Sequence, residues 1–332
     1  MTEREALPAG VTGSLDTPAG PVPVLRGEFR PGDRLASWRA RWGIGRMKMR
    51  IKPGLYALGS PGQDSPVFAS ANYRLSFDAL RTSVKGDAWL LVLDTRGINV
   101  WCAAGKGTFG TLELTRSIME SGLEKLVARK EIIVPQLGAP GVAAHRVGAY
   151  TGFKVVYGPV RAADIPEFMA AGKKASPGMR LVRFGFADRV ILSPLELAYF
   201  SKFLLPASAL LYFLGLKADA LLTVATLISG TLLVPALLPW LPGRAFTVKG
   251  AAAGAIGLAA LYPFLSQDPL HACARALIYL PAASFIGLQF TGTSTYTSLS
   301  GVMKEMRAAL PVQAASLLAG IALLTLGRFL WA

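Results

Sequence analysis

The sequence predicts an α/β domain with a mainly parallel sheet, followed by an all-α membrane bundle of five transmembrane helices. Two observations lead to this fold class. Short apolar runs alternate with helical patterns up to about residue 193, and long apolar stretches follow. Hydrophobic residues make up 52% of the 332 residues and crowd into the last third of the chain, which soluble domains seldom show.

Residues 1–45 are predicted to form an irregular basic extension. They contain no apolar core of the kind that marks a secretory signal. Lys and Arg number 35 against 20 acidic residues, a net charge of +15, and residues 39–52 contain six basic residues and no acidic one. Such a segment favours anionic lipid headgroups as a partner. Nucleic acid stacked on Trp38 and Trp42 is the less favoured alternative in a chain with membrane spans.

Residues 46–193 are predicted to form the α/β domain. Apolar runs indicate strands at 67–71, 89–93, 132–134, 155–157 and 190–192, and helical patterns lie at 76–84, 100–104, 111–121, 143–151 and 163–171. This alternation is typical of a parallel sheet covered by helices. Ligands of such sheets bind at the carboxyl ends of the strands.

Residues 194–332 are predicted to form the transmembrane domain. Apolar windows at 196–216, 220–241, 249–266, 272–291 and 310–331 are each close to the roughly 20 residues that span a bilayer. Pro206, Pro235, Pro263 and Pro281 interrupt four of them, which bundled helices tolerate. Most Lys and Arg residues precede this region, so we expect the first domain in the cytoplasm and the helices in the cell (inner) membrane.

The most informative segment is the octet at residues 99–106, Asn-Val-Trp-Cys-Ala-Ala-Gly-Lys. Asn99 is a good N-cap residue, which makes Cys102 the third residue of a short helix, where the helix start favours a thiolate. One thiolate can occupy an axial position of a cofactor whose other positions are filled. Small residues follow it and leave room for a wide ligand. A buried, inert cysteine is the alternative that local features leave open, and Trp101 could anchor the helix to the domain.

A second motif overlaps the octet. Residues 105–110 match G-x-G-x-x-G and precede a helical pattern, with Glu131 at a plausible distance for a ribose contact. A dinucleotide fingerprint starts directly after a strand, however, and here the short helix intervenes. We therefore expect no dinucleotide site.

The octet resembles the cap-helix motif of the HgcA family, the membrane-bound corrinoid proteins of mercury methylation. Residues 70–76 (Ser-Ala-Asn-Tyr-Arg-Leu-Ser) and 158–166 (Gly-Pro-Val-Arg-Ala-Ala-Asp-Ile-Pro) are similar to segments of the related corrinoid iron–sulfur proteins. Five carboxyl-terminal membrane helices are also that family's architecture. The resemblance implies that the first domain is a Rossmann-like corrinoid-binding domain.

The resemblance also implies a cobalamin-type corrinoid cofactor with Cys102 as the lower axial ligand to cobalt and the catalytic residue. The implied cofactor-binding residues are Ser70, Asn72, Ser76, Asn99, Val100, Trp101, Cys102, Ala103, Ala104, Gly105, Lys106 and Gly138. Two of these have alternatives, because Ser76 could be an N-cap and Asn72 could stabilise a turn. His145 lacks the aspartate of a histidine-ligand motif, since Ala143 stands there, so we expect a surface or packing residue.

The implied activity is a methyltransferase that passes a methyl group from cobalt to Hg(II), forming methylmercury. A thiolate ligand pushes electron density toward the opposite bond and eases departure of methyl as a carbanion equivalent. The implied partners are a ferredoxin-like protein of HgcB type with two 4Fe-4S clusters, a methyl donor protein or methyl-folate, and an Hg(II)-thiolate substrate. A methyl carrier of one-carbon metabolism and a non-enzymatic corrinoid-binding membrane protein are the alternatives.

Overall fold

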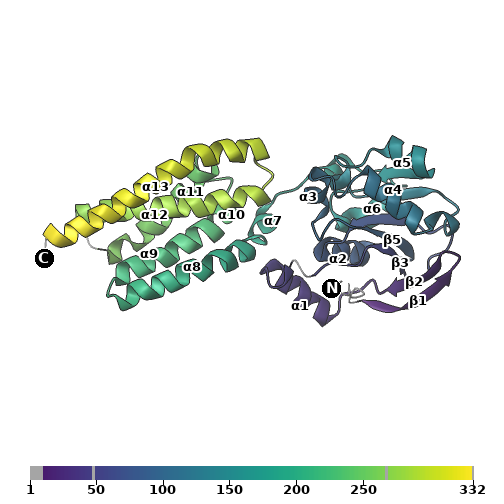
Figure 1. The fold of residues 1–332 in the computed structure, drawn as a ribbon, viewed down its shortest axis with the longest axis horizontal. Coiled ribbons are helices and arrows are strands. Elements are labelled where there is room, and N and C mark those ends of the chain that lie inside the picture. Colours follow the sequence, from purple (N-terminus) through teal and green to yellow (C-terminus); the bar gives the residue numbers. More distant parts are fainter. Residues whose placement is uncertain (1–9, 47–48, 266–267, 331–332) are drawn as a thin grey trace. The chain divides into compact units, whose positions relative to one another are not determined.

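A computed structural model describes residues 10–46, 49–265 and 268–330. The chain divides into two compact units, one formed by residues 1–40 and 44–182 and the other by residues 41–43 and 183–332. Figure 1 shows a mixed α/β unit and a unit made of helices.

The first unit is built on one seven-stranded sheet with the order β1-β2-β3-β5-β4-β6-β7. The strands are β1 (Val11–Thr17), β2 (Gly20–Leu25), β3 (Gly54–Leu58), β4 (Val67–Ala71), β5 (Ala88–Leu93), β6 (Glu131–Val134) and β7 (Lys154–Tyr157). The pairs β2–β3, β4–β5, β4–β6 and β6–β7 are parallel, whereas β1–β2 and β3–β5 are antiparallel. The prediction of a mainly parallel sheet is therefore confirmed.

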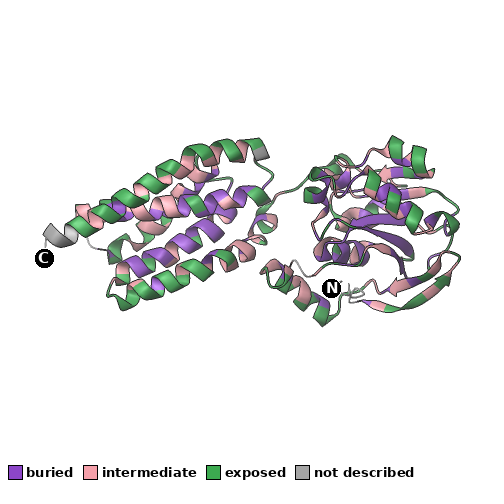
Figure 2. Ribbon diagram, in the orientation of Figure 1, coloured by how far each residue is buried: buried purple, intermediate pink, exposed green. Residues whose placement is uncertain are grey.

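Helices cover both faces of this sheet. They are α1 (Pro31–Arg41), α2 (Arg74–Ser83), α3 (Val100–Gly105), α4 (Thr111–Glu120), α5 (Ala144–Thr151) and α6 (Ile165–Ala170). Side chains of β5 alternate between the faces, because Trp89 and Leu91 join the core under α3, α4 and α5, while Leu90 and Val92 join the core under α2 and α6. The central strands are buried in Figure 2. A sheet covered on both faces explains why these strands read as continuous apolar runs.

The expectation of an irregular extension at residues 1–45 is wrong for the part that the structure describes. Strands β1 and β2 form a hairpin closed at Thr17 and Gly20, and β2 adds to the sheet beside β3. The sequence did not indicate these two strands, because an edge hairpin has one exposed face. Polar residues therefore alternate with apolar ones, and β2 also contains two prolines. β3 was also missed.

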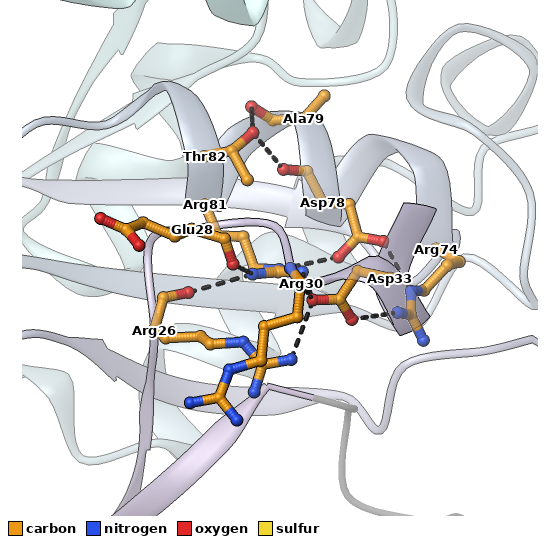
Figure 3. A network of polar contacts seen from close by, with 9 residues as sticks. All are labelled: Arg26, Glu28, Arg30, Asp33, Arg74, Asp78, Ala79, Arg81 and Thr82. Carbon is orange, nitrogen blue, oxygen red and sulfur yellow. Dashed lines mark hydrogen bonds and ion pairs between the residues drawn. The ribbon is translucent and has the colours of Figure 1, made fainter. Parts of the chain in front are cut away.

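A buried ion-pair network ties α1 to α2 (Figure 3). The Asp33 carboxylate accepts hydrogen bonds from Arg26 at 2.8 Å and from Arg74 at 3.0 Å. Asp78 accepts from Arg74 at 2.6 Å and from Arg81 at 2.7 Å. Arg81 is fully buried and also donates to the backbone carbonyls of Arg26 and Glu28. The network therefore fixes α2 against the amino-terminal segment.

The second unit is a bundle of helices. It contains α7 (Phe186–Val190), α8 (Ser193–Phe213), α9 (Lys217–Ile228), a π-helical turn (Ser229–Leu233), α10 (Val234–Leu237), α11 (Phe246–Leu261), α12 (Pro269–Gln289) and α13 (Leu299–Leu330). The strand expected at 190–192 is wrong, because these residues end α7 and lead into α8. Arg189 of α7 is buried and donates to the carbonyls of Pro235 and Ala236 within α10, so α7 packs against the bundle.

Four helices in the described residues are long and apolar enough to cross a membrane, at Phe186–Phe213, Lys217–Leu237, Pro269–Gly292 and Ser300–Leu326. The predicted count of five is not confirmed. The window expected at 249–266 corresponds to α11, which has 16 residues and ends in a 3₁₀ turn at Tyr262–Phe264. At 1.5 Å per residue α11 is about 24 Å long, shorter than a hydrocarbon core of about 30 Å.

Small residues let the bundle helices approach closely. A Cβ on Gly250 would lie 2.7 Å from the carbonyl oxygen of Ala283, and one on Gly287 would lie 2.8 Å from the Cα of Gly250. A Cβ on Gly320 of α13 would lie 2.8 Å from the carbonyl oxygen of Ala274. Close backbone packing of this kind is how helices associate in lipid, where burial of apolar surface gives little driving force.

Candidate functional site

A cavity of about 320 Å³ lies at the carboxyl ends of the central parallel strands. Phe68, Ala69 and Ser70 of β4 line it, together with Ile133 of β6. The chain leaves β4 toward α2 on one face of the sheet and leaves β6 toward α5 on the other. The gap between β4 and β6 is thus the topological switch point, where open α/β sheets bind their ligands.

Four more segments complete the wall of the cavity. Helix α2 contributes Ser76, Ala79 and Leu80, and the start of α3, with its N-cap, contributes Asn99, Val100 and Trp101. The segments after β6 and β7 add Pro135, Leu137, Gly158, Pro159, Val160, Ala162 and, at the start of α6, Ile165. The lining is mostly apolar with a few polar side chains, which is typical of a site for an organic ligand.

The predicted cap helix is present as α3, with Asn99 as its N-cap. The side-chain oxygen of Asn99 accepts a hydrogen bond of 2.9 Å from the backbone N–H of Cys102. This bond satisfies one of the free N–H groups at the helix start and fixes the first turn, which carries the thiol. The predicted third position for Cys102 in the helix is therefore confirmed.

Helix α3 has one buried and one exposed face. Val100, Ala103 and Ala104 pack in the core of the domain. Cys102 is exposed, so the alternative of a buried cysteine is wrong. Trp101 is 42% exposed and lines the cavity, so part of its side chain is available to a ligand. Gly105 and Lys106 lie exposed on the same side as the thiol.

Gly105 leaves open space beside the thiol. A Cβ placed on it would have no heavy atom within 4 Å. The glycine is thus not required by packing, in contrast to Gly138 and Gly141 in the loop after β6. A Cβ on Gly138 would lie 2.5 Å from Phe109, and one on Gly141 would lie 2.2 Å from the Phe109 carbonyl oxygen. These two glycines hold the loop close to α3, and Gly138 does not line the cavity.

Asn72 organises the loop that leads from β5 into α3. Its side chain is buried, its oxygen accepts from the backbone N–H groups of Thr95 at 3.1 Å and Gly97 at 2.8 Å, and its amide donates to Asp94 at 3.1 Å. The Thr95 hydroxyl lies 2.8 Å from the same oxygen. Of the two roles considered for Asn72, the geometry supports stabilisation of the turn. By fixing the loop that leads into α3, these hydrogen bonds make Asn72 a hub that positions Asn99 and Cys102.

The other predicted residues divide between the cavity and the surface. Ser70 is buried and lines the cavity. Ser76 also lines it, and the N-cap alternative for Ser76 is wrong because α2 begins at Arg74 after Tyr73. His145 is exposed on α5, as expected. Gly105 ends α3 instead of following a strand, which agrees with the expectation of no dinucleotide fingerprint at residues 105–110.

The sequence missed the contribution of the loop after β7. Pro159 and Val160 line the cavity. They belong to the segment 158–166, which resembles corrinoid proteins but is not among the predicted cofactor-binding residues. The sequence does contain a signal for this contribution, because the segment directly follows a strand whose carboxyl end lies at the ligand-binding edge of the sheet.

Together, the fold, the cavity at the switch point and the exposed thiol define the first unit as an α/β domain of a ligand-binding type. Residues 44–169 match the family model described as CO dehydrogenase/acetyl-CoA synthase delta subunit. The chain is 34% identical over 132 residues to an acetyl-CoA decarbonylase/synthase complex subunit gamma of Archaeoglobus fulgidus, covering 37% of this chain and 27% of that protein. It is 29% identical over 141 residues to the corrinoid/iron-sulfur protein large subunit of Moorella thermoacetica, covering 41% and 31%.

These similarities relate the chain to the corrinoid iron–sulfur protein family. The family model matches residues within the α/β unit. The chain spans about a third or less of the length of these curated relatives, 27% of one and 31% of the other.

Proposed function

We propose that this chain is a membrane-anchored corrinoid protein that transfers a methyl group from cobalt, with Cys102 as the lower axial ligand. The observation that carries the proposal is the exposed Cys102 thiol in the capped first turn of α3, next to Trp101, which lines the cavity at the switch point of the sheet. Similarity to a corrinoid/iron-sulfur protein large subunit supports a corrinoid as the ligand.

The residues present fit a corrinoid in two respects. A thiolate is a strongly donating ligand that can hold one axial position of a cobalt whose equatorial positions the macrocycle fills. The macrocycle is wide and flat, and the cavity of about 320 Å³ is at the small end of ligand pockets, so part of the ligand must lie outside it. The exposed face of α3 offers that space, because Gly105 leaves the surface beside Cys102 open.

Each residue of the site then has a separate task. Cys102 would hold the cobalt, and Ser70 and Ser76 would donate hydrogen bonds to the polar periphery of the ligand from the cavity wall. Asn99 keeps the first turn of α3 in place, and Asn72 fixes the loop before it. The bound corrinoid would supply a cobalt centre that accepts and releases methyl groups. Ligand donation from the thiolate favours release of methyl with its electron pair.

For the acceptor we propose Hg(II), held by thiolates, which would leave as methylmercury. The support is the octet at residues 99–106, which resembles the cap-helix motif of the mercury-methylating family, combined with apolar helices after the α/β unit. Because methyl would depart with both bonding electrons, two electrons would have to be returned before the next methyl group could be loaded. A ferredoxin-like protein with two 4Fe-4S clusters is the proposed source, and a methyl-folate or methyl donor protein is the proposed supplier of methyl.

We place the α/β unit in the cytoplasm and the bundle in the inner membrane.

The comparisons favour a second candidate function. The relatives are named as subunits of an acetyl-CoA decarbonylase/synthase complex, so this chain would instead be a membrane-anchored methyl carrier of one-carbon metabolism. Its acceptor would be a nickel or thiol centre in a partner protein. Both candidates require the same corrinoid and the same Cys102, and they differ in the group that receives methyl.

The test uses the full chain, purified without oxygen and loaded with a methylated cobalamin. We expect Cys102→Ala to shift the visible absorption band of the corrin and to lower methyl transfer to a Hg(II)-thiol complex by at least about a hundredfold, the scale on which loss of a metal-site interaction acts. Cys273→Ala is the matched control, because it removes the other free cysteine, which lies in α12.

The outcomes separate the candidates. An unchanged spectrum in the Cys102 variant would contradict axial ligation. Transfer from the wild-type protein to a nickel or thiol acceptor without transfer to Hg(II) would support the one-carbon carrier. Binding of the corrinoid without transfer to any acceptor would mean a non-enzymatic corrinoid-binding protein.

A further inference from the structure

A buried ion pair lies inside the helical bundle. Arg275 of α12 donates through Nε to Oδ1 of Asp219 in α9 at 3.1 Å, and through Nη2 to Oδ2 at 3.4 Å. The Tyr279 hydroxyl donates to the Asp219 carbonyl oxygen at 3.0 Å. The side chains of Asp219 and Arg275 are 9% and 8% exposed. Ionisable residues in membrane helices are costly, so such a pair points to a function beyond anchoring.

One donor of this cluster has no partner in the described part of the chain. The Nη1 atom of Arg275 is buried and makes no hydrogen bond. Arg275 lines a cavity of about 520 Å³, together with Asp219, Thr223, His271 and Tyr279. A buried guanidinium N–H without an acceptor is unfavourable. The unpaired donor beside the cavity therefore fits an oxygen atom brought by a ligand.

Apart from Thr226 and Thr325, the rest of the first cavity is lined by apolar residues, and a second cavity adjoins it. Leu211, Ile278, Ile321 and Leu324 line the first cavity. A neighbouring cavity of about 560 Å³ lies among residues of α8, α12 and α13, and Leu204 and Ala282 line both. The two cavities thus form one apolar groove with the ion pair at one end. A ligand that fills it has a long hydrocarbon part and a polar end.

In a membrane spanned by these helices, the polar end would lie near the lipid headgroups. Asp219 is the third residue of α9 and Arg275 the seventh of α12. At 1.5 Å per residue they lie about 3–9 Å from the starts of these helices, and both helices belong to segments long and apolar enough to cross a membrane. Both helices begin at this end of the bundle, and their amino termini carry partial positive charge. Asp219 neutralises Arg275, so the site favours a singly charged anion over a doubly charged one.

We propose that this groove is a binding site for a membrane phospholipid. A phosphodiester oxygen accepts the hydrogen bond from Nη1 of Arg275, and the acyl chains occupy the groove between α8, α12 and α13. This site belongs to the bundle alone and does not depend on the corrinoid chemistry proposed above.

The test is native mass spectrometry of the full chain after removal of bulk lipid, followed by titration with palmitoyl-oleoyl phosphatidylglycerol. We expect the wild-type chain to retain one phospholipid. The pair Asp219→Asn with Arg275→Met removes the free donor without leaving a lone buried charge, and it should weaken binding about tenfold or more, the scale of a charge-assisted hydrogen bond. Ala282→Phe should do the same by filling the groove where the two cavities meet.

Ala315→Phe is the matched control, because Ala315 is exposed on α13 and lines neither cavity. If the paired variant fails to fold, the Ala282 variant carries the test. Diacylglycerol with the same chains distinguishes a headgroup site from an apolar groove, and sodium phosphate distinguishes lipid from free phosphate. Equal affinity for diacylglycerol, displacement by phosphate alone, or unchanged phospholipid binding in the Ala282 variant would each overturn the proposal.

Discussion

At the residue scale, the geometry of the site depends on two asparagines that do different work. Asn99 caps α3 with one hydrogen bond to the Cys102 N–H, whereas Asn72 holds the preceding loop with several. The loop needs this support because Arg96 and Gly97 have positive φ values of 58° and 74°. For the arginine this backbone conformation is unfavourable, and the hydrogen bonds that the N–H groups of Gly97 and Arg96 donate to Asn72 and Asp94 offset its cost.

We therefore expect Asn72→Ala to destabilise the α/β unit by about 2–4 kcal/mol, since it leaves the buried N–H groups of Thr95 and Gly97 without their acceptor. Asn99→Ala should cost only about 1 kcal/mol, the usual loss of an N-cap, and Asn99→Ser should restore most of it. Urea unfolding followed by tryptophan fluorescence measures these differences. Equal losses for the two asparagines would contradict the role of Asn72 as a hub.

At the scale of elements, the position of α3 results from close contact with the loop after β6. Gly141 lies against the backbone of Phe109 and Ala104, so neither side can yield to a side chain. Gly105, one turn after Trp101 on the exposed face, meets no such limit. Gly141 is thus required for the packing of α3. Gly105 is not required for packing, and it leaves the exposed face of the helix open to a ligand.

Gly141→Ala is expected to destabilise the domain by about 1–3 kcal/mol, because its Cβ would overlap the Phe109 carbonyl oxygen. Gly105→Ala should leave stability unchanged or slightly higher, since alanine is the better helix former. If the corrinoid lies on the exposed face of α3, the same methyl group should weaken corrinoid binding. Thermal unfolding and cobalamin titration, applied to both variants, measure the two effects, and tight binding by Gly105→Ala would argue against a ligand on this face.

The ion-pair network between α1 and α2 makes a prediction about pH. Burial raises the pKa of the Asp33 carboxyl, but the hydrogen bonds from Arg26 and the Arg30 N–H and the charge of Arg81 outweigh it, so the pKa lies below its ordinary value. A depressed carboxylate pKa contributes stability that is present above the unfolded value of about 4 and is lost as pH falls through the folded value.

We therefore expect the stability of the α/β unit to fall more steeply below about pH 4 in the wild type than in Asp33→Asn. The asparagine variant should already be less stable by about 3–5 kcal/mol at pH 7, because it leaves buried arginine charges uncompensated. Urea midpoints measured across this pH range give both quantities. Parallel profiles of stability against pH for the two proteins would show that Asp33 does not contribute to the pH dependence of stability.

At the scale of the whole molecule, the two units have separate cores. The buried clusters around β4 and β5 contain residues of the first unit alone, and the clusters of the bundle contain residues of the second alone. The boundary falls at residues 182 and 183, in a segment without a regular element before α7. Each unit therefore contains the contacts that its own fold requires.

A fragment ending at Val182 is accordingly expected to fold without the bundle and to bind a corrinoid within about threefold of the affinity of the full chain, a difference below 1 kcal/mol. Circular dichroism, a single cooperative unfolding transition and cobalamin titration check this. The full chain in detergent is the reference. A fragment that folds but binds no corrinoid would place part of the site in the bundle.

The sequence by itself determined the central elements and the local geometry of the cap helix. β4 was predicted at 67–71 and α3 from Val100, and Asn99 is the N-cap, because a buried strand and a capped short helix are specified by residues close together in the chain. The edge hairpin β1–β2 was missed because its pattern of polar and apolar residues is mixed, and strand β3 was missed because its partners β2 and β5 are distant in sequence.

Only the tertiary structure decided what these elements bring together. The cavity at the switch point depends on the order of β4 and β6 in the sheet, and the pairing of Asp219 with Arg275 joins residues 56 positions apart. The role of Asn72 likewise became clear only when its partners, more than 20 residues away, were in place. Local patterns fix capping and strand burial, whereas long-range pairing depends on packing that no short window of sequence records.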